Sequence, residues 1–414
     1  MKSVIGCLLC TTLCLAVAPA FARALPKPAQ IDAQVATLMQ RTGAQGLAIA
    51  IIDRGQPVYV QAYGKRNAQG DPLTVAQGLA IAIIDRGQPV YVQAYGKRNA
   101  QGDPLTVDTV MYGASLTKTV FAYTVMRWVG QERIALDTSI ADDLPQPLPQ
   151  YTGEDLVTRY TDWSALDERW RKLTPRILLQ HASGFANFGF LEPDEKLHFH
   201  FDPGTRYAYS GDGLATLQFV LEQGRGLDVG QGTDAVFAEL GMTRTALKWR
   251  PDFAGNLADG WDANGKPAPH DDRSRVRAAG SMDTTIRDLA KFAAALVAGR
   301  GIGAREQAEM LRPQRPITTR SQFPTLQPEL PPAQRRKDLS AGLGVVTFEG
   351  PQGPGFFKGG HNDTTGNTLV CLRRQQRCVL VLGNDVRAEK GFAELVEFVL
   401  GKTGVPYDWE YGTS

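Results

Sequence analysis

The stretch MYGASLTKTV, residues 111–120, decides how this chain is interpreted. It opens an apolar segment over residues 115–129, SLTKTVFAYTVMRWV, which predicts a buried helix that begins at Ser115. Residues three apart share a helix face, so the Lys118 ammonium group can approach the Ser115 hydroxyl. A helix N-terminus also carries the positive end of the helix dipole, which stabilises a developing negative charge. Ser115 is therefore a candidate nucleophile; the alternative is a serine N-cap followed by a solvated lysine.

Lys118 can act as a base only where burial or a neighbouring cation lowers its pKa. The apolar residues Val120, Phe121 and Ala122 follow it closely, which favours burial. We therefore expect Lys118 to help deprotonate Ser115.

Two later segments carry side chains that would serve such a nucleophile. Tyr209-Ser210-Gly211 lies in a turn-rich stretch, where a tyrosine flanked by lysines can transfer protons. Lys358-Gly359-Gly360-His361 lies on a predicted strand, where two glycines let a substrate backbone approach and the lysine offers a cation to a carboxylate. The alternatives are a packed surface tyrosine and a hairpin with a bulge.

Composition and motifs exclude several other functions. The 414 residues include 45 Lys+Arg and 43 Asp+Glu, and the net charge of +2 is far below that of typical nucleic-acid-binding domains. The sequence contains no phosphate-binding loop, no dinucleotide fingerprint and no Gly-x-Ser-x-Gly elbow. With five His and five Cys, and with His198 and His200 lacking a third ligand at suitable spacing, we expect neither metal nor cofactor.

The first 22 residues are typical of a secretory signal peptide. Lys2 precedes an apolar run that ends near Ala22, and the run is too short to span a bilayer. Cleavage would remove Cys7, Cys10 and Cys14 and would deliver residues 23–414 to the periplasm or the medium.

Cys371 and Cys378 remain after this cleavage. The segment TLVCLRRQQRCVLVL alternates like a hairpin with a loop over residues 373–376, which places the two cysteines opposite each other. We expect a disulfide in an oxidising compartment; the alternative is two free thiols.

Residues 44–75 recur without change as residues 76–107. Each copy is typical of a hairpin, with an apolar strand, a turn and an alternating strand. Because the second copy leads directly into the helix at Ser115, we expect it to occupy the sheet. Residues 44–75 would then bulge out or extend a sheet edge.

In the rest of the chain, the spacing of apolar residues predicts a helix over residues 29–42 and a largely helical region over 131–275. Thr285 predicts the capped start of a further helix. Six prolines within residues 312–338 indicate a long surface loop. Short strands follow up to residue 384, and a final helix over 393–402 closes the chain.

The order Ser-x-x-Lys, Tyr-Ser and Lys-Gly-Gly resembles the serine β-lactamase and penicillin-binding protein superfamily. The resemblance covers nearly the whole mature chain and is strongest to the class C β-lactamase branch, which includes D-amino-acid peptidases and family VIII esterases. Supporting segments are VYVQAYGKRN (90–99), LLQHASGF (178–185), PGTRYAYSG (203–211) and RAAGSMDTT (277–285). The implied α/β (α+β) fold has an antiparallel sheet from both chain ends, about 23–130 and 276–414, with helices on its faces. A helical lobe, about 131–275, is inserted.

The resemblance also implies roles for single residues. Ser115 would be acylated, Lys118 would help to deprotonate it, and Tyr209 would act as general base and then general acid. Lys358 would orient Tyr209 and bind a substrate carboxylate, while the backbone N–H groups of Ser115 and His361 would form an oxyanion hole.

Two positions depart from the pattern of the resemblance. Gly211 stands where the family usually has an Asn that contacts the substrate's acylamide. Gly359 stands where class C enzymes have a Thr, so a hydroxyl partner for the substrate carboxylate is lost.

The expected activity is hydrolysis of a small-molecule substrate by an exported enzyme, with β-lactam amides ranked first because of Lys358 and the leader. An esterase, a D-amino-acid peptidase, a slowly deacylating penicillin-binding protein and a non-enzymatic remnant remain alternatives. The resemblance implies no nucleic-acid partner and no stable membrane anchor after cleavage, and the oligomeric state stays open.

Overall fold

A computed structural model of the chain describes residues 78–412 continuously. It also describes the backbones of residues 46–53 and 56–64 and the helical positions Gln30, Ala33, Gln34 and Thr37. The predicted leader, residues 1–22, and most of the predicted helix over 29–42 lie outside the described residues.

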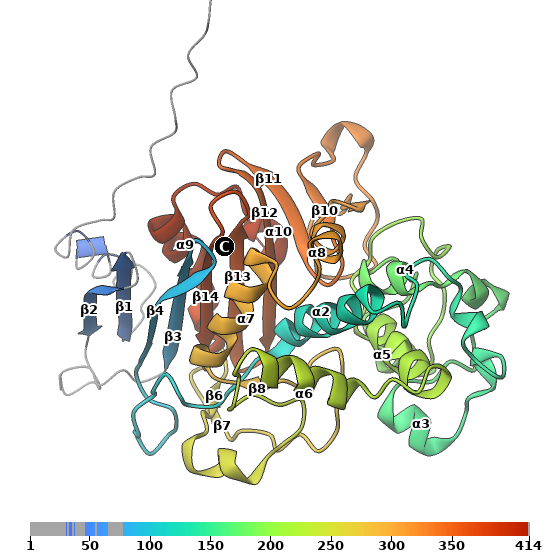
Figure 1. Ribbon diagram of the computed structural model, residues 1–414, viewed down its shortest axis with the longest axis horizontal. Helices are drawn as coiled ribbons and strands as arrows, with labels where there is room; N and C mark the ends of the chain where they lie inside the picture. The colour runs from blue at the N-terminus through green and yellow to red at the C-terminus, as the bar shows by residue number, and fades with distance from the viewer. Residues whose placement is uncertain are drawn as a thin grey trace, which may run out of the picture.

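An antiparallel sheet of eight strands, in the order β4-β3-β14-β13-β12-β11-β10-β9, organises the molecule (Figure 1). The strands β3 and β4 precede Ser115, yet β3 pairs with β14 near the C-terminus, so the sheet is built from both ends of the chain as the sequence predicted. The strands are β3 (Leu79–Asp85), β4 (Gln88–Tyr95), β9 (Arg315–Pro316), β10 (Leu339–Ala341), β11 (Val346–Gly350), β12 (Gly353–Asn362), β13 (Thr365–Leu372) and β14 (Arg377–Gly383).

Both faces of this sheet are covered, which explains why its inner strands are apolar throughout. Alternate residues of β3 enter different clusters: Ala80, Ala82 and Ile84 face α2 (Thr117–Gly130) and α7 (Ile286–Ala298). Leu79, Ile81 and Ile83 share the opposite cluster with α9 (Phe392–Leu400) and α10 (Tyr407–Tyr411). The two-residue period of a strand therefore divides the core into two layers.

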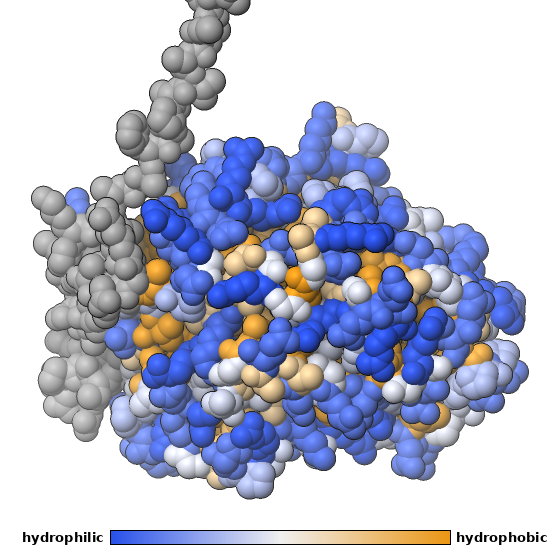
Figure 2. Space-filling view, in the orientation of Figure 1, coloured by the Kyte–Doolittle hydropathy of each residue, from blue (hydrophilic) through white to orange (hydrophobic). Residues whose placement is uncertain are grey.

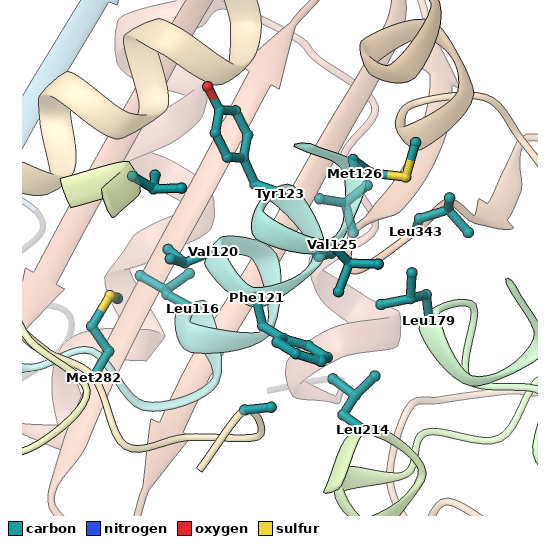
Figure 3. Packing of buried hydrophobic residues seen from close by; sticks show 14 of the residues in the cluster. Leu116, Val120, Phe121, Tyr123, Val125, Met126, Leu179, Leu214, Met282 and Leu343 are labelled. Carbon is teal, nitrogen blue, oxygen red and sulfur yellow. The ribbon is translucent and has the colours of Figure 1, made fainter. Parts of the chain in front are cut away.

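Helix α2 carries the nucleophile turn at its N-terminus and is buried on almost every side. Figure 3 shows its side chains pointing in several directions, with Phe121 and Val125 on the side of Leu179 and Leu214. A helix that is apolar all round is stable only inside a core. This burial fixes the position of the residues that precede the helix.

Between α2 and α7 the chain consists mainly of turns and loops that carry short helices and short pieces of strand, so the predicted largely helical region over 131–275 is helical only in part, because its many loop-forming residues keep the helices short. Its α-helices are α3 (Glu154–Arg159), α4 (Pro175–Leu179), α5 (Gly211–Phe219) and α6 (Val229–Glu239). A π-helical turn over Val220–Gly224 prolongs α5. Two small sheets pair β5 (Met111–Tyr112) with β8 (Asp283–Thr284) and β6 (Gly260–Trp261) with β7 (Pro267–Ala268).

Helix α7 begins as predicted, because the Thr285 side chain accepts a hydrogen bond from the Asp288 backbone N–H at 3.1 Å. Gly299 ends the helix in the left-handed conformation, with a φ of 70°. Helix α8 (Ala304–Met310) follows it.

The two identical segments form hairpins of identical register. β1 (Gly46–Asp53) and β2 (Gln56–Gly64) pair Ile51 with Tyr59, as β3 and β4 pair Ile83 with Tyr91, and a bulge follows in both. The second copy occupies the large sheet, as expected. The first copy forms its own two-stranded sheet beside β4 (Figure 1).

The cysteine hairpin has the predicted register. β13 ends at Leu372, β14 begins at Arg377, and Cys371 pairs directly with Cys378. A disulfide joins the two residues, which are both fully buried.

Two predictions about the C-terminal part were wrong. The proline-rich stretch 312–338 is not only a surface loop, because Ile317 and Gln322 within it are buried. The final helix does not close the chain, because α10 follows α9 and buries Trp409 and Glu410. With only five residues, α10 is too short to produce a helical periodicity in the sequence.

The face of the molecule shown in Figure 2 is largely hydrophilic, with scattered hydrophobic residues, as on most globular surfaces. Within the described part of the chain, helices long and apolar enough to cross a bilayer are absent.

Candidate active site

A cleft of about 610 Å³ lies where the sheet meets the helical region. Its wall includes the predicted residues Ser115, Lys118, Tyr209, Lys358, Gly359, Gly360 and His361. These residues come from three distant parts of the sequence. Gly211 is not part of the wall, although its neighbour Asp212 is.

Ser115 lies in a single 3-10 turn, Ala114–Leu116, and the α-helix itself begins two residues later than predicted, at Thr117. The cause is local: Ala114 has a φ of 46°, which a continuous helix does not allow. The Thr117 hydroxyl donates to the Ala114 carbonyl at 2.5 Å and fixes this turn. Such backbone strain is common where a turn aims a reactive side chain.

Lys118 is buried directly beneath Ser115. Its Nζ donates to Ser115 Oγ at 3.0 Å and to the Ala279 carbonyl oxygen. Burial lowers the pKa of Lys118, and the charge of Lys358 lowers it further, while Tyr209 opposes the shift. Lys118 therefore lies next to Ser115, as predicted. Its lowered pKa also favours the neutral amine, which is the form that can accept a proton.

Tyr209 reaches Ser115 from the other side of the cleft. Its hydroxyl donates to Ser115 Oγ at 2.9 Å. Two amines lie near its ring, with Lys118 Nζ at 5.0 Å and Lys358 Nζ at 5.1 Å from the ring centroid. Two proton-carrying groups thus converge on one serine oxygen.

His181 supports Tyr209, a role that the sequence did not reveal. The two rings are 4.5 Å apart between centroids, and His181 Nδ1 accepts a hydrogen bond from the Ser210 backbone N–H at 3.2 Å. Burial, together with Lys118 and Lys358, holds the pKa of His181 well below its usual value, so the ring is neutral. A neutral imidazole is the form that can accept this bond.

Strand β12 forms an open edge along the cleft. Its pairing with β11 ends at Val346 and Phe357, whereas its pairing with β13 continues to Asn362. A Cβ on Gly360 would lie 3.1 Å from the Ser115 backbone nitrogen, so a glycine permits this close approach. The approach brings the backbone of β12 next to the nucleophile turn.

Alternation along β12 directs Lys358 and Gly360 toward α2, and Gly359 and His361 toward the opposite face. His361 Nδ1 lies 3.1 Å from a Glu389 carboxylate oxygen, and this contact raises the pKa of His361 despite burial.

Glu410 of α10 also lines the cleft, although no pattern in the sequence indicates it. A Cβ at position 359 would lie 2.1 Å from Glu410 Oε1, so the carboxylate fills the volume that a side chain there would need. Glu410 Oε2 accepts a hydrogen bond from Gln322 at 2.8 Å, and Gln322 accepts one from the Tyr207 hydroxyl at 2.9 Å. Burial raises the pKa of Glu410 above its usual value, and the charges of Lys358 and His361 only partly oppose this shift.

Gly211 has a packing role. A Cβ there would lie 2.4 Å from the Phe188 ring, and the Gly211 N–H donates to the Asn187 side-chain oxygen at 2.9 Å. Asn187 and Phe188 both line the cleft and were not predicted. A side chain at position 211 would therefore collide with Phe188.

Asp212 is a buried carboxylate on the same side of the cleft. One of its oxygens accepts hydrogen bonds from the Gly189 N–H at 2.6 Å and the Thr161 hydroxyl at 2.8 Å. Burial nevertheless raises its pKa to about 6.

Among the described residues, no cluster of three or more His, Cys, Asp or Glu side chains could hold a metal ion.

Solved structures with the same architecture include three relevant neighbours. The D-alanine carboxypeptidase AmpC from Burkholderia cenocepacia is 17% identical with a TM-score of 0.62, over 90% of this chain and 98% of that chain. A class C beta-lactamase is 15% identical with a TM-score of 0.63, over 90% and 94%. A beta-lactamase/D-alanine carboxypeptidase from Pseudomonas syringae is 15% identical with a TM-score of 0.63, over 90% and 98%. At these identities the likeness shows the fold.

Sequence comparison gives a family. A human protein named beta-lactamase-like 1 is 38% identical over 104 residues, which make up 24% of this chain and only 20% of the human protein. The family model described as Beta-lactamase matches residues 71–400, a span that includes the Ser115 turn, Tyr209 and β12. Because this match extends over most of the chain, the protein belongs to the beta-lactamase family of serine hydrolases.

Proposed function

We propose that this protein is an exported serine hydrolase that cleaves small acyl compounds through an acyl-enzyme on Ser115. The observation that carries the proposal is the convergence of Lys118 Nζ at 3.0 Å and Tyr209 Oη at 2.9 Å on Ser115 Oγ, at the wall of a cleft. A nucleophile with its base in hydrogen-bond reach is the arrangement that covalent catalysis requires.

In the proposed reaction, Ser115 Oγ attacks the substrate's acyl carbon and its proton passes to the Lys118–Tyr209 pair. The same pair returns a proton to the leaving group as the tetrahedral intermediate collapses. Water then attacks the ester on Ser115 and gives a proton to the pair, and the pair returns this proton to Ser115 Oγ as the acid leaves. The buried amine of Lys118 supports this role, since burial favours its neutral form.

The proposed oxyanion hole consists of the backbone N–H groups of Ser115 and His361. Gly360 supports this assignment because its backbone lies against the Ser115 turn and positions the next residue of β12 beside it. Each such donor typically contributes about 3 kcal/mol of transition-state stabilisation.

Two substrate classes fit this proposal. β-Lactam amides are supported by the leader and by Lys358, whose amine lies 5.1 Å from the Tyr209 ring centroid. Esters are favoured by a specific observation, since a carboxylate, Glu410, stands where a carboxylate-binding hydroxyl is expected. Export is proposed from the composition of residues 1–22, with support from the buried disulfide between Cys371 and Cys378.

The test is the hydrolysis of a chromogenic cephalosporin and of a short-chain aryl ester by residues 23–414, beside Ser115→Ala. We expect turnover of at least one substrate and its loss in Ser115→Ala. Equal rates in both proteins would overturn the proposal. A stable adduct in intact-mass spectra, without turnover, would instead identify a slowly deacylating penicillin-binding protein.

A further inference from the structure

Glu410 brings a negative charge to the part of the cleft where Lys358 was expected to receive a substrate carboxylate. The exposed fraction of Glu410 is 5%, so little solvent screens it. Its Oε1 atom lies within 2.1 Å of the position that a Cβ at residue 359 would take. Its position is fixed by the hydrogen bond from Gln322 at 2.8 Å.

Lys358 is poorly placed to receive an anion by itself. Its Nζ donates a hydrogen bond to the Gly359 carbonyl oxygen of its own strand. Burial lowers the pKa of Lys358, and the charge of Glu410 opposes this shift. The buried amine and the buried carboxylate therefore stabilise each other's charge, and little positive potential remains for a third group.

The surroundings of this pair suit an uncharged group. The Phe323 ring lies 5.6 Å from the rings of both Tyr209 and His361, measured between centroids, and 38% of Phe323 is exposed at the cleft. These rings offer an apolar contact surface on the side of the cleft that Gly359 and Glu410 line.

We propose that Glu410 determines leaving-group specificity. Its carboxylate neutralises the positive charge of Lys358 and repels a substrate carboxylate beside Gly359. The cleft therefore selects substrates whose leaving group is uncharged. The inference rests on the proposed Ser115 hydrolase function and assigns the substrate class, namely esters or amides of neutral alcohols, thiols or amines. A β-lactam, which carries a carboxylate on the leaving-group side, would be a poor substrate.

The experiment uses three thioesters with the same acetyl group, so that deacylation is identical and only the leaving thiol differs. S-butyl thioacetate is neutral, S-acetyl-3-mercaptopropionate is anionic and acetylthiocholine is cationic. Released thiol is followed at about pH 8, where ordinary carboxyl groups are ionised. The quantity compared is the ratio of kcat/KM values, for the native protein and for Glu410→Gln.

We expect the native protein to prefer the neutral over the anionic thioester by tenfold or more. Glu410→Gln keeps an oxygen that can accept from Gln322, and it should raise the anionic-to-neutral ratio by at least tenfold while lowering the cationic-to-neutral ratio. Glu349→Gln is the matched control, because Glu349 is an exposed carboxylate outside the cleft wall and its removal changes the net charge equally. This control should leave both ratios within about twofold.

The outcomes separate this inference from the proposed function. Turnover that depends on Ser115, with ratios unchanged in Glu410→Gln, would overturn the role of Glu410 and leave the hydrolase intact. A native preference for the anionic thioester would also overturn it. Absence of turnover together with absence of Ser115 labelling by a fluorophosphonate would reject the hydrolase itself.

Discussion

Ser115 Oγ receives two hydrogen bonds, from Lys118 Nζ and Tyr209 Oη, and both donors are held by other groups of the fold. Lys118 also contacts the Ala279 carbonyl, and Tyr209 packs on the neutral ring of His181. Neither donor can turn away from the serine without breaking a second contact. The reactive geometry is therefore set before a substrate arrives, which reduces the reorganisation needed for the reaction.

Lys118→Arg tests whether the buried amine must lose its proton. Arginine keeps the positive charge but is not deprotonated in proteins, so we expect kcat/KM to fall by about 10²–10⁴-fold. In the native protein kcat/KM should rise with pH, because the neutral amine is the base. The midpoint should lie below 10.5, the ordinary value, because burial lowers the pKa of Lys118.

The measurement is a pH–rate profile of the two proteins beside Lys291→Arg, whose native amine contacts Asp288 on α7 at 3.0 Å. The control should keep the native profile. A Lys118→Arg enzyme with near-native kcat/KM would show that Tyr209 alone removes the proton.

Asp212→Asn addresses stability. Burial raises the folded-state pKa of Asp212 to about 6, from 3.8 in the unfolded chain. The contribution of Asp212 to the free energy of unfolding is therefore most favourable below pH 3.8, and it is lost as the pH rises through about 6. An amide oxygen can accept both existing hydrogen bonds, because they end on one carboxylate oxygen. The variant should therefore be more stable than the native protein at pH 7, by about 3 kcal/mol, and most of this difference should disappear near pH 4.

Urea unfolding at several pH values measures this difference. Asp363→Asn, at an exposed position between β12 and β13, provides the comparison and should show no comparable change with pH. A pH-independent difference between Asp212→Asn and the native protein would contradict the burial effect.

At the scale of elements, β12 and the Ser115 turn depend on a glycine. A methyl group at Gly360 would lie about 3 Å from backbone atoms of Gly113, Ser115 and Leu116, which cannot rotate away. Gly360→Ala should displace β12 from the turn and separate the two proposed oxyanion donors. We expect kcat to fall by about 10²-fold or more.

Gly255→Ala is the matched control, because nothing lies within 4 Å of a Cβ at that position. Steady-state kinetics and thermal unfolding of the two variants separate a local from a global effect. Full activity in a folded Gly360→Ala protein would reject the close contact between β12 and the turn.

The duplicated hairpin gives a second prediction at this scale. β3 and β4 supply the sheet strands, whereas β1 and β2 form a separate sheet beside β4. Deletion of residues 44–75 should therefore keep kcat/KM within about twofold and raise the soluble yield, since an additional exposed strand edge favours aggregation. A deletion variant that folds but is inactive would give the first copy a role in function.

For the molecule as a whole, the sequence predicted the features that local chemistry determines. Ser115 and Lys118 follow from helical spacing, and the hairpin at Cys371 and Cys378 follows from alternation. The residues that it did not predict act through tertiary packing. His181 and Glu410 carry no recognisable pattern, and only the folded chain brings Glu410 against Gly359, 51 positions earlier in the sequence.

Tertiary packing also accounts for the two wrong predictions at the C-terminal end. Proline content indicates where regular structure ends, but it does not indicate what covers the resulting loop. In the fold, α10 packs against the stretch 312–338, since Trp409 lies within hydrogen-bond distance of Thr319 and Gln322 contacts Glu410. Both segments become part of one cleft wall for this reason.

Covalent labelling of Ser115 tests the central claim most directly. The mature chain, Ser115→Ala and Lys118→Arg would be incubated with a fluorophosphonate, and the adduct would be located by peptide mass spectrometry. The proposed mechanism predicts stoichiometric labelling on Ser115 in the native protein, much slower labelling in Lys118→Arg and none in Ser115→Ala. A folded native protein that remains unlabelled, or carries the label on another residue, would contradict it.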